Sequence, residues 1–297
     1  MENRLDISNS LNQDSILQRY LDLPKFLFLL QSNSLFLSKM SKFEDQLEGG
    51  LTANDYLKTT DDAPILDLAL NGLFPVPNEP PSTRQARLAE CAVIETAISS
   101  SEFSTPFGNY PCSQAKTIFP RCREWLYVSC WHQSDNECAA MWPLYGGKNS
   151  ICIFTTAKQI LEQITVPQEL TKAILSPVSY INHDAASFDN KQHGPFTSKS
   201  LPYTYEREVR LTAWNPEINL NTERENPGVG AVAKISDLGK LINYIVVSPK
   251  SDAWFKESIE LLCRDYHLDV EILDSSLKRK PPASIYDVLA HIQTPNC

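Results

Sequence analysis

The C-terminal third of the chain carries the pattern that most constrains the fold. An apolar run at 245–249 precedes an amphipathic segment at 253–266, and a second apolar run follows at 268–273. This order predicts strand, helix and strand, and a crossover helix of this kind joins parallel strands of one sheet. We therefore expect a C-terminal β-α-β extension over about residues 230–275.

The middle of the chain predicts the core to which that extension is attached. Residues 125–131 (WLYVSCW) predict a strand, residues 136–145 a helix, and residues 151–155 a second strand. The other predicted elements are strands at 17–20, 34–38 and 205–214, helices at 25–31, 84–99, 157–163 and 168–175, and a turn-rich connector at 101–117.

The expected fold class is α+β. We expect one domain over residues 15–297, with a mixed-sheet core at about 15–215 and the extension after it, preceded by a flexible segment at 1–14. The sequence contains neither the G-x-G-x-x-G motif of dinucleotide-binding folds nor the G-x-x-x-x-G-K-[S/T] phosphate loop. Ten glycines in 297 residues also disfavour a Rossmann-type nucleotide fold.

Composition and charge exclude several classes of protein. With 27 lysines and arginines against 36 aspartates and glutamates, the net charge of −9 does not favour a nucleic-acid partner, whose phosphates require a basic surface. The longest apolar run, residues 26–30, is far too short to span a membrane. The start of the chain lacks the basic and apolar regions of a secretory signal, which predicts a cytoplasmic protein whose eight cysteines are free thiols.

Four separated motifs follow one another along the chain: an Arg-Tyr strand at 19–20, FEDQLEG at 43–49, MWPLY at 141–145 and YEREVRL at 205–211. In this order they resemble a bacterial family of unknown function that is often found in phage-defence contexts. The resemblance covers roughly residues 17–275. It implies a defence-system partner protein or a phage trigger, but it does not imply a reaction.

The order of strands and polar residues supports a second resemblance. Arg19 on an early strand is followed by the strand–helix–strand unit and then by a late Glu-x-Glu, Glu206 and Glu208. This arrangement is similar to the ADP-ribosyltransferase fold. The resemblance implies that NAD is the substrate, and that the protein transfers ADP-ribose or hydrolyses NAD as a defence or toxin-type effector.

Glu206 and Glu208 are the candidate catalytic residues. Alternation along a strand would point both carboxylates to one face, where each would raise the pKa of the other. The transferase resemblance implies that Glu208 bonds the nicotinamide ribose and stabilises an oxocarbenium-like transition state, while Glu206 positions or deprotonates the acceptor. The alternative is a solvated strand face on which Arg207 and Arg210 form ordinary ion pairs.

Five further residues are candidates for binding NAD. Arg19 would grip the pyrophosphate through its guanidinium, with Tyr20 beside it. Ser129 aligns with the transferase serine, and Trp142 and Tyr145, three positions apart on the predicted helix, would stack on the nicotinamide or adenine ring. Each also has an ordinary structural interpretation, as a surface arginine in an ion pair or as a residue of the core.

Two other function classes remain open at this point. Asp45 and Glu48 could complete a Mg²⁺ or Mn²⁺ site with the two later glutamates, which would make the protein a metal-dependent nuclease. We favour instead a structural role, in which Asp45 caps backbone N–H groups of a tight loop, and we expect no metal. The third class is a non-catalytic module that senses a phage component or a nucleotide.

Overall fold

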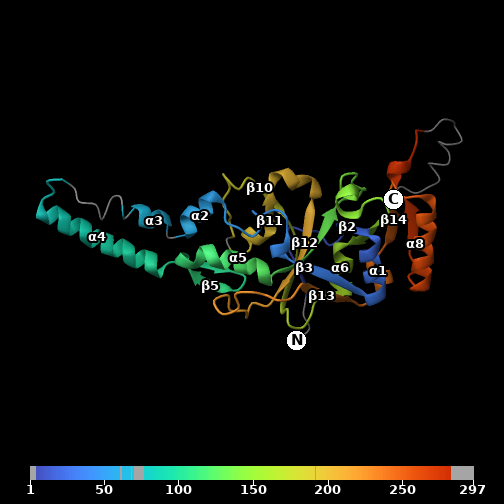
Figure 1. Ribbon diagram of the computed structural model, residues 1–297, viewed down its shortest axis with the longest axis horizontal. Helices are drawn as coiled ribbons and strands as arrows, with labels where there is room; N and C mark the ends of the chain where they lie inside the picture. Colours follow the sequence, from blue (N-terminus) through green and yellow to red (C-terminus); the bar gives the residue numbers. More distant parts are fainter. Residues whose placement is uncertain (1–4, 61, 68, 70–76, 191, 282–297) are drawn as a thin grey trace.

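The protein is built around one large mixed β-sheet, seen in a computed structural model that describes residues 5–60, 62–67, 69, 77–190 and 192–281 (Figure 1). Within these ranges eleven strands form the sheet, in the order β1-β9-β12-β6-β2-β7-β14-β15, with β3, β13 and β8 continuing from β6. Their bounds are β1 Leu5–Ile7, β2 Ile16–Asp22, β3 Ser34–Lys39, β6 Tyr127–Gln133, β7 Ser150–Thr156, β8 Ile164–Thr165, β9 Lys172–Pro177, β12 Glu208–Trp214, β13 Gly230–Ile235, β14 Tyr244–Val247 and β15 Glu271–Asp274.

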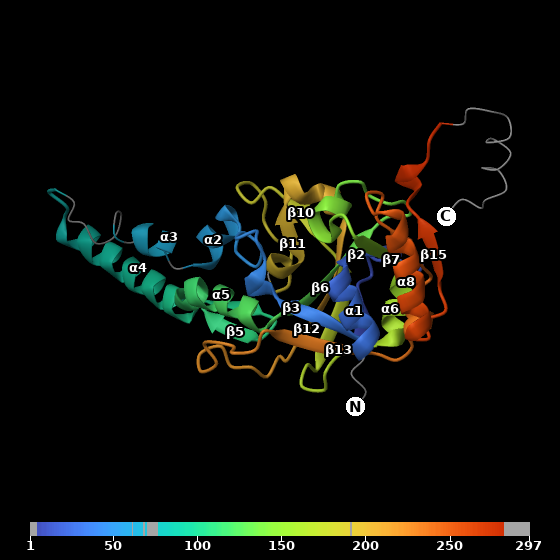
Figure 2. The ribbon, with the colours of Figure 1, turned by 45° about the vertical axis from the view of Figure 1, so that its right-hand side comes forward.

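Helices cover the sheet, and one group of them extends away from it. Figures 1 and 2 both show α3 and α4 projecting from the body, whereas α1, α6 and α8 contact the strands. The helices are α1 Leu23–Ser32, α2 Ala53–Thr59, α3 Asp62–Asp67, α4 Pro81–Ser100, α5 Ala115–Trp125, α6 Ala157–Gln163, α7 Leu238–Leu241 and α8 Ala253–Asp265. Two strand pairs lie outside the main sheet: β4 Glu102–Thr105 with β5 Gly108–Pro111, and β10 Ser179–Ile181 with β11 Ser198–Ser200.

The predicted α+β class and the C-terminal β-α-β extension are confirmed. Strands β14 and β15 are parallel and are joined by α8, which buries Phe255, Ile259 and Cys263. Strand β14 also pairs antiparallel with β7. The extension therefore continues the same sheet as the core.

Local signals at the first helix are also confirmed. The side chain of Asp22 accepts a hydrogen bond from the backbone N–H of Lys25, and Pro24 lies in the first turn of α1. The helix ends at Asn33, whose φ of 45° is the left-handed conformation common at helix ends. This cap directs the chain straight into β3.

Strand β12 lies between β6 and β9, and all seven of its residues are buried. Its two faces differ in chemistry. Val209, Leu211 and Ala213 belong to the main hydrophobic core, and because side chains alternate along a strand, Glu208 and Arg210 project from the opposite face. Buried charges of this kind require partners, which the next subsection identifies.

Strands β2 and β6 separate soon after they meet. They pair only at Leu17 with Gln133 and at Gln18 with His132, after which β2 continues beside β7. Strand β3 pairs with the opposite end of β6. A gap therefore opens between β2 and β3 along one edge of β6.

The helix predicted at 136–145 is wrong except at its end, where a single π-helical turn spans Trp142–Gly146. Side chains of β2 bind the backbone that such a helix would need. Gln18 Nε2 donates to the carbonyl oxygens of Ser134 and Asn136 at 2.6 and 2.9 Å, and the Tyr20 hydroxyl accepts from the N–H of Cys138 at 2.9 Å. Pro143, which lacks an N–H, also disfavours an α-helix here.

Two more predictions are wrong because tertiary pairing overrides local pattern. The helix predicted at 168–175 is largely strand β9, which lies between β12 and β1. The flexible segment predicted at 1–14 contains β1, which pairs with β9 and buries Leu5, and Leu11 is buried as well. Residues 168–175 show no strand-like alternation, and the alternating Leu5-Asp6-Ile7 is only three residues long.

The turn-rich connector predicted at 101–117 is instead a hairpin, β4 and β5, followed by the start of α5. Gly108, with φ of 111°, allows the tight turn between the two strands. Phe103 and Tyr110 of the hairpin pack into a second core with Phe119 of α5.

The seven cysteines that the structure describes are free thiols, as predicted, and Cys297 lies outside the described residues. In the same described part of the chain, no helix is long and apolar enough to cross a membrane.

Candidate active site

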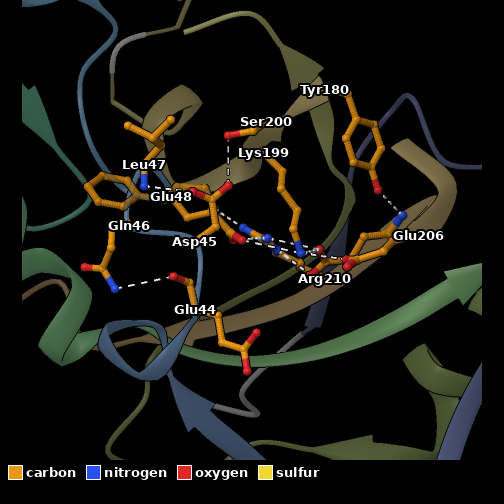
Figure 3. Close-up of polar contacts among 12 residues, drawn as sticks. Glu44, Asp45, Gln46, Leu47, Glu48, Tyr180, Lys199, Ser200, Glu206 and Arg210 are labelled. Atoms are coloured by element: carbon orange, nitrogen blue, oxygen red, sulfur yellow. Dashed lines mark hydrogen bonds and ion pairs between the residues drawn. The ribbon is translucent and has the colours of Figure 1, made fainter. Parts of the chain in front are cut away.

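Five charged side chains meet in the interior, beside the polar face of β12 (Figure 3). Lys199 Nζ lies 2.6 Å from a carboxylate oxygen of Glu206, 3.3 Å from one of Glu208 and 3.4 Å from one of Glu48. Arg210 binds Glu208 through Nε at 2.7 Å and Glu48 through Nη2. All five residues are buried. Three carboxylates thus share two cations.

The two candidate catalytic glutamates come from different backbone conformations. Glu208 begins β12, whereas Glu206 ends a 3₁₀ helix, Leu201–Glu206, so the strand predicted at 205–214 is wrong at its start. Arg207 between them has φ of 40°, in the left-handed region. The carbonyl oxygen of Glu206 lies 2.5 Å from Nδ1 of His132, which holds this turn against β6. Glu206 and Glu208 therefore lie close together because of this turn, and not because side chains alternate along a strand.

The two cations determine the ionisation of Glu208. Burial acts to raise its pKa, but the charge and hydrogen bonds of Arg210 and the charge of Lys199 outweigh burial and lower the pKa to about 2. The prediction that neighbouring carboxylates would raise it is therefore wrong, because the charges of Arg210 and Lys199 prevail. For Glu48, burial prevails over the two cations, and its pKa is raised.

A cavity of about 610 Å³ occupies the gap between β2 and β3, a volume typical of small-ligand sites. Its walls are mostly apolar, with Phe28 and Leu29 from α1 and Leu35 and Phe36 from β3. Five of the seven candidate residues line it. They are Arg19, Tyr20, Tyr145, Glu206 and Glu208. Glu48, in contrast, does not line the cavity.

Arg19 is the cation of this cavity that lacks a carboxylate partner, since no ion pair to it occurs among the described residues. Its Nη1 donates to the hydroxyl of Ser129, and its guanidinium carbon lies 5.4 Å from the ring centroid of Trp131. Burial lowers its pKa to about 10, which still leaves it charged at neutral pH. Ser129 is buried and does not line the cavity, so it orients Arg19 instead of facing a ligand.

Arg19 and Glu208 reach the cavity from different faces of the sheet. Register aligns Gln18, His132 and Glu208 on one face, which places Arg19 on the other face with Trp131. Both nevertheless line the cavity, because β2 and β6 separate directly after Gln18. At the last paired position, two interstrand spacings put the backbones of Gln18 and Glu208 about 10 Å apart.

The aromatic candidates do not act as a pair. Tyr145 is 43% exposed and donates its hydroxyl proton to Glu206 at 2.9 Å. Trp142 is buried, with its ring 4.9 Å from that of Tyr20 and its Nε1 donating to Glu137 at 3.2 Å. The π-helical turn therefore separates the two rings, and Trp142 is a core residue that does not line the cavity.

Asp45 has the structural role predicted for it. One carboxylate oxygen accepts from the N–H of Leu47 at 2.9 Å, and the other accepts from the hydroxyl of Ser200 at 2.9 Å.

The nuclease hypothesis requires a divalent cation among the glutamates of this cluster. The ammonium of Lys199 lies there, between Glu48, Glu206 and Glu208. Among the residues that the structure describes, no cluster of three or more His, Cys, Asp or Glu could hold a metal ion.

Comparisons with known proteins leave the function to be inferred from the cavity. No family model matches the chain, so the resemblance to a family of unknown function gains no support there, and no curated protein matches it. Among solved structures, DarT of Thermus sp. 2.9 in complex with ADP-ribosylated ssDNA matches 92% of this chain and 100% of that chain, with 6% sequence identity and a TM-score of 0.37. A TM-score this low supports no argument about activity.

Proposed function

We propose that the cavity binds NAD and that the protein cleaves its nicotinamide–ribose bond, passing ADP-ribose to water or to another acceptor. The observation that supports this most is the pairing of chemistries in one cavity: Arg19 has no carboxylate partner among the described residues, while Glu206 and Glu208 belong to a cluster that has more carboxylates than cations. NAD carries the two complementary groups: an anionic pyrophosphate for Arg19 and a cationic nicotinamide riboside for the glutamates.

The charged groups already present in the site are sufficient for the proposed step. When the C1′–N bond breaks, its electron pair stays with nicotinamide, which leaves as a neutral molecule, and positive charge develops on the ribose. Glu208 is ionised at neutral pH and would stabilise that charge. A water or acceptor hydroxyl then attacks C1′, and Glu206, which Tyr145 holds, would orient it and take its proton. In this proposal the protein acts as a defence or toxin-type effector.

Replacing Arg19 by methionine is expected to weaken NAD binding by about 10-fold or more, because a charge-assisted bond to the pyrophosphate is lost. Isothermal titration calorimetry with NAD measures this change. Lys25→Met is the matched control: Lys25 also lines the cavity, but it is 60% exposed and already pairs with Asp22 at 2.8 Å. If the two variants bind NAD equally well, Arg19 is not the pyrophosphate ligand.

One observation favours a second candidate, a nucleotide-binding module without catalysis. Both carboxylate oxygens of Glu206, the proposed proton acceptor, are already bound, one by the hydroxyl of Tyr145 and the other by Lys199. A carboxylate held in this way stabilises charge but is a poor proton acceptor. Binding of NAD without release of nicotinamide would select this candidate.

A further inference from the structure

The charge cluster behind the cavity contains a residue whose role the proposed function leaves open. Lys199 occupies the middle of the short strand β11, and its ammonium contacts all three buried glutamates. Glu206 depends on it most, because Lys199 is the cation that pairs with Glu206 among the described residues. Its Nζ also lies 4.7 Å from the ring centroid of Tyr203.

We propose that Lys199 is the positioning residue of this site: its ammonium holds the carboxylates of Glu206 and Glu208 side by side at the wall of the cavity. Two like charges this close repel each other, so the arrangement requires a cation between them. Arg210 cannot serve this purpose for Glu206, because its contacts go to Glu208, to Glu48 and to the carbonyl oxygen of Phe196. The catalytic consequence rests on the proposed function, whereas the effect on ionisation does not.

The other groups around the cluster do not supply the missing charge. Burial raises the pKa of Tyr145 and Cys130 and raises that of Tyr180 to about 12, so these three are neutral at pH 5 to 8. Burial also lowers the pKa of His132, which keeps it mainly neutral near pH 7. Charge balance therefore rests on Lys199 and Arg210 alone among the residues that contact the three glutamates in the described structure.

The test is the pH dependence of the melting temperature of Lys199→Met, compared with wild type between pH 8 and pH 5. With one cation left for three carboxylates, a carboxylate of the folded variant will bind a proton that it releases on unfolding. The folded state then binds more protons than the unfolded one, so its stability falls as pH rises. We expect the melting temperature of the variant to approach that of wild type by about 2 °C for each pH unit lowered.

Two further variants test whether the change in melting temperature is caused by the lost charge of Lys199. Lys199→Arg keeps the cation, and its difference in melting temperature from wild type should not change with pH. The double variant Lys199→Met, Glu206→Gln restores the wild-type excess of one carboxylate, and it should be more stable than Lys199→Met at pH 8. The double variant also gives the answer if Lys199→Met does not fold. A double variant no more stable than Lys199→Met, or a Lys199→Met difference that is constant with pH, would overturn the proposal.

Activity provides the second readout. If the protein cleaves NAD, kcat/KM of Lys199→Met should decline as pH falls, because protonation removes the carboxylate charge, and Lys199→Arg should restore the wild-type pH profile. Absence of NAD cleavage in wild type would refute the proposed function and leave the melting experiment valid. A pH-independent melting difference together with wild-type NAD cleavage would refute only the role of Lys199.

Discussion

Replacing Glu208 by glutamine is expected to slow NAD cleavage by about 10²–10³-fold, the usual cost of losing one preorganised electrostatic contact with a transition state. Glutamine keeps the size of the side chain and removes only its charge. The fold should survive, because Glu48 and Glu206 would then balance Lys199 and Arg210. Chromatographic measurement of nicotinamide release, at matched concentrations of folded protein, gives the rate.

Glu48→Gln is the matched control for that experiment. It removes the same charge from the same cluster, and Glu48 contacts the same two cations, but it does not line the cavity. We expect this variant to lose much less activity than Glu208→Gln. Equal losses in the two variants would mean that the total charge of the cluster matters and that Glu208 has no direct contact with the reacting ribose.

Replacing Arg210 by methionine is expected to have the largest effect on stability, a loss of about 3–5 kcal/mol in the free energy of unfolding. Arg210 is fully buried and pairs with both Glu48 and Glu208. Without it, three buried carboxylates share the single ammonium of Lys199. Urea denaturation followed by circular dichroism measures the change.

Lys148→Met provides the comparison for Arg210→Met. Lys148 pairs with Asp252 at 3.0 Å, but both side chains are exposed, so water replaces the lost contact and the effect should be small. A similar, small loss in Arg210→Met would show that the buried ion pairs of Arg210 with Glu48 and Glu208 contribute little to the free energy of unfolding.

The parts of the fold that the sequence predicts correctly are those with local causes. The cap at Asp22 and the stop at Asn33 define α1, and the apolar runs around α8 define the C-terminal extension. The failures have non-local causes. Strand β9 forms because β1 and β12 lie on either side of it, and the segment before Trp142 is not helical because side chains of β2 bind its backbone.

The same distinction applies to the site. Arg19, Tyr145, Glu206 and Glu208 could be selected from motif order, and they do line one cavity. Lys199 could not be selected, because its neighbours Ser198 and Ser200 form no recognisable motif, and its partners are remote in the chain or separated from it by a turn. Without Lys199, the cation that pairs with Glu206 in the described structure could not be predicted.

The central claim is that this cavity breaks the nicotinamide–ribose bond, and single-turnover cleavage of NAD tests it most directly. The purified wild-type protein is mixed with an equal concentration of NAD, and nicotinamide and ADP-ribose, free or attached to protein, are quantified over time. We predict one ADP-ribose for each nicotinamide released, at a rate that falls about 10²–10³-fold in Glu208→Gln. NAD that binds, as calorimetry would show, yet stays intact, or a rate that Glu208→Gln leaves unchanged, would contradict the claim.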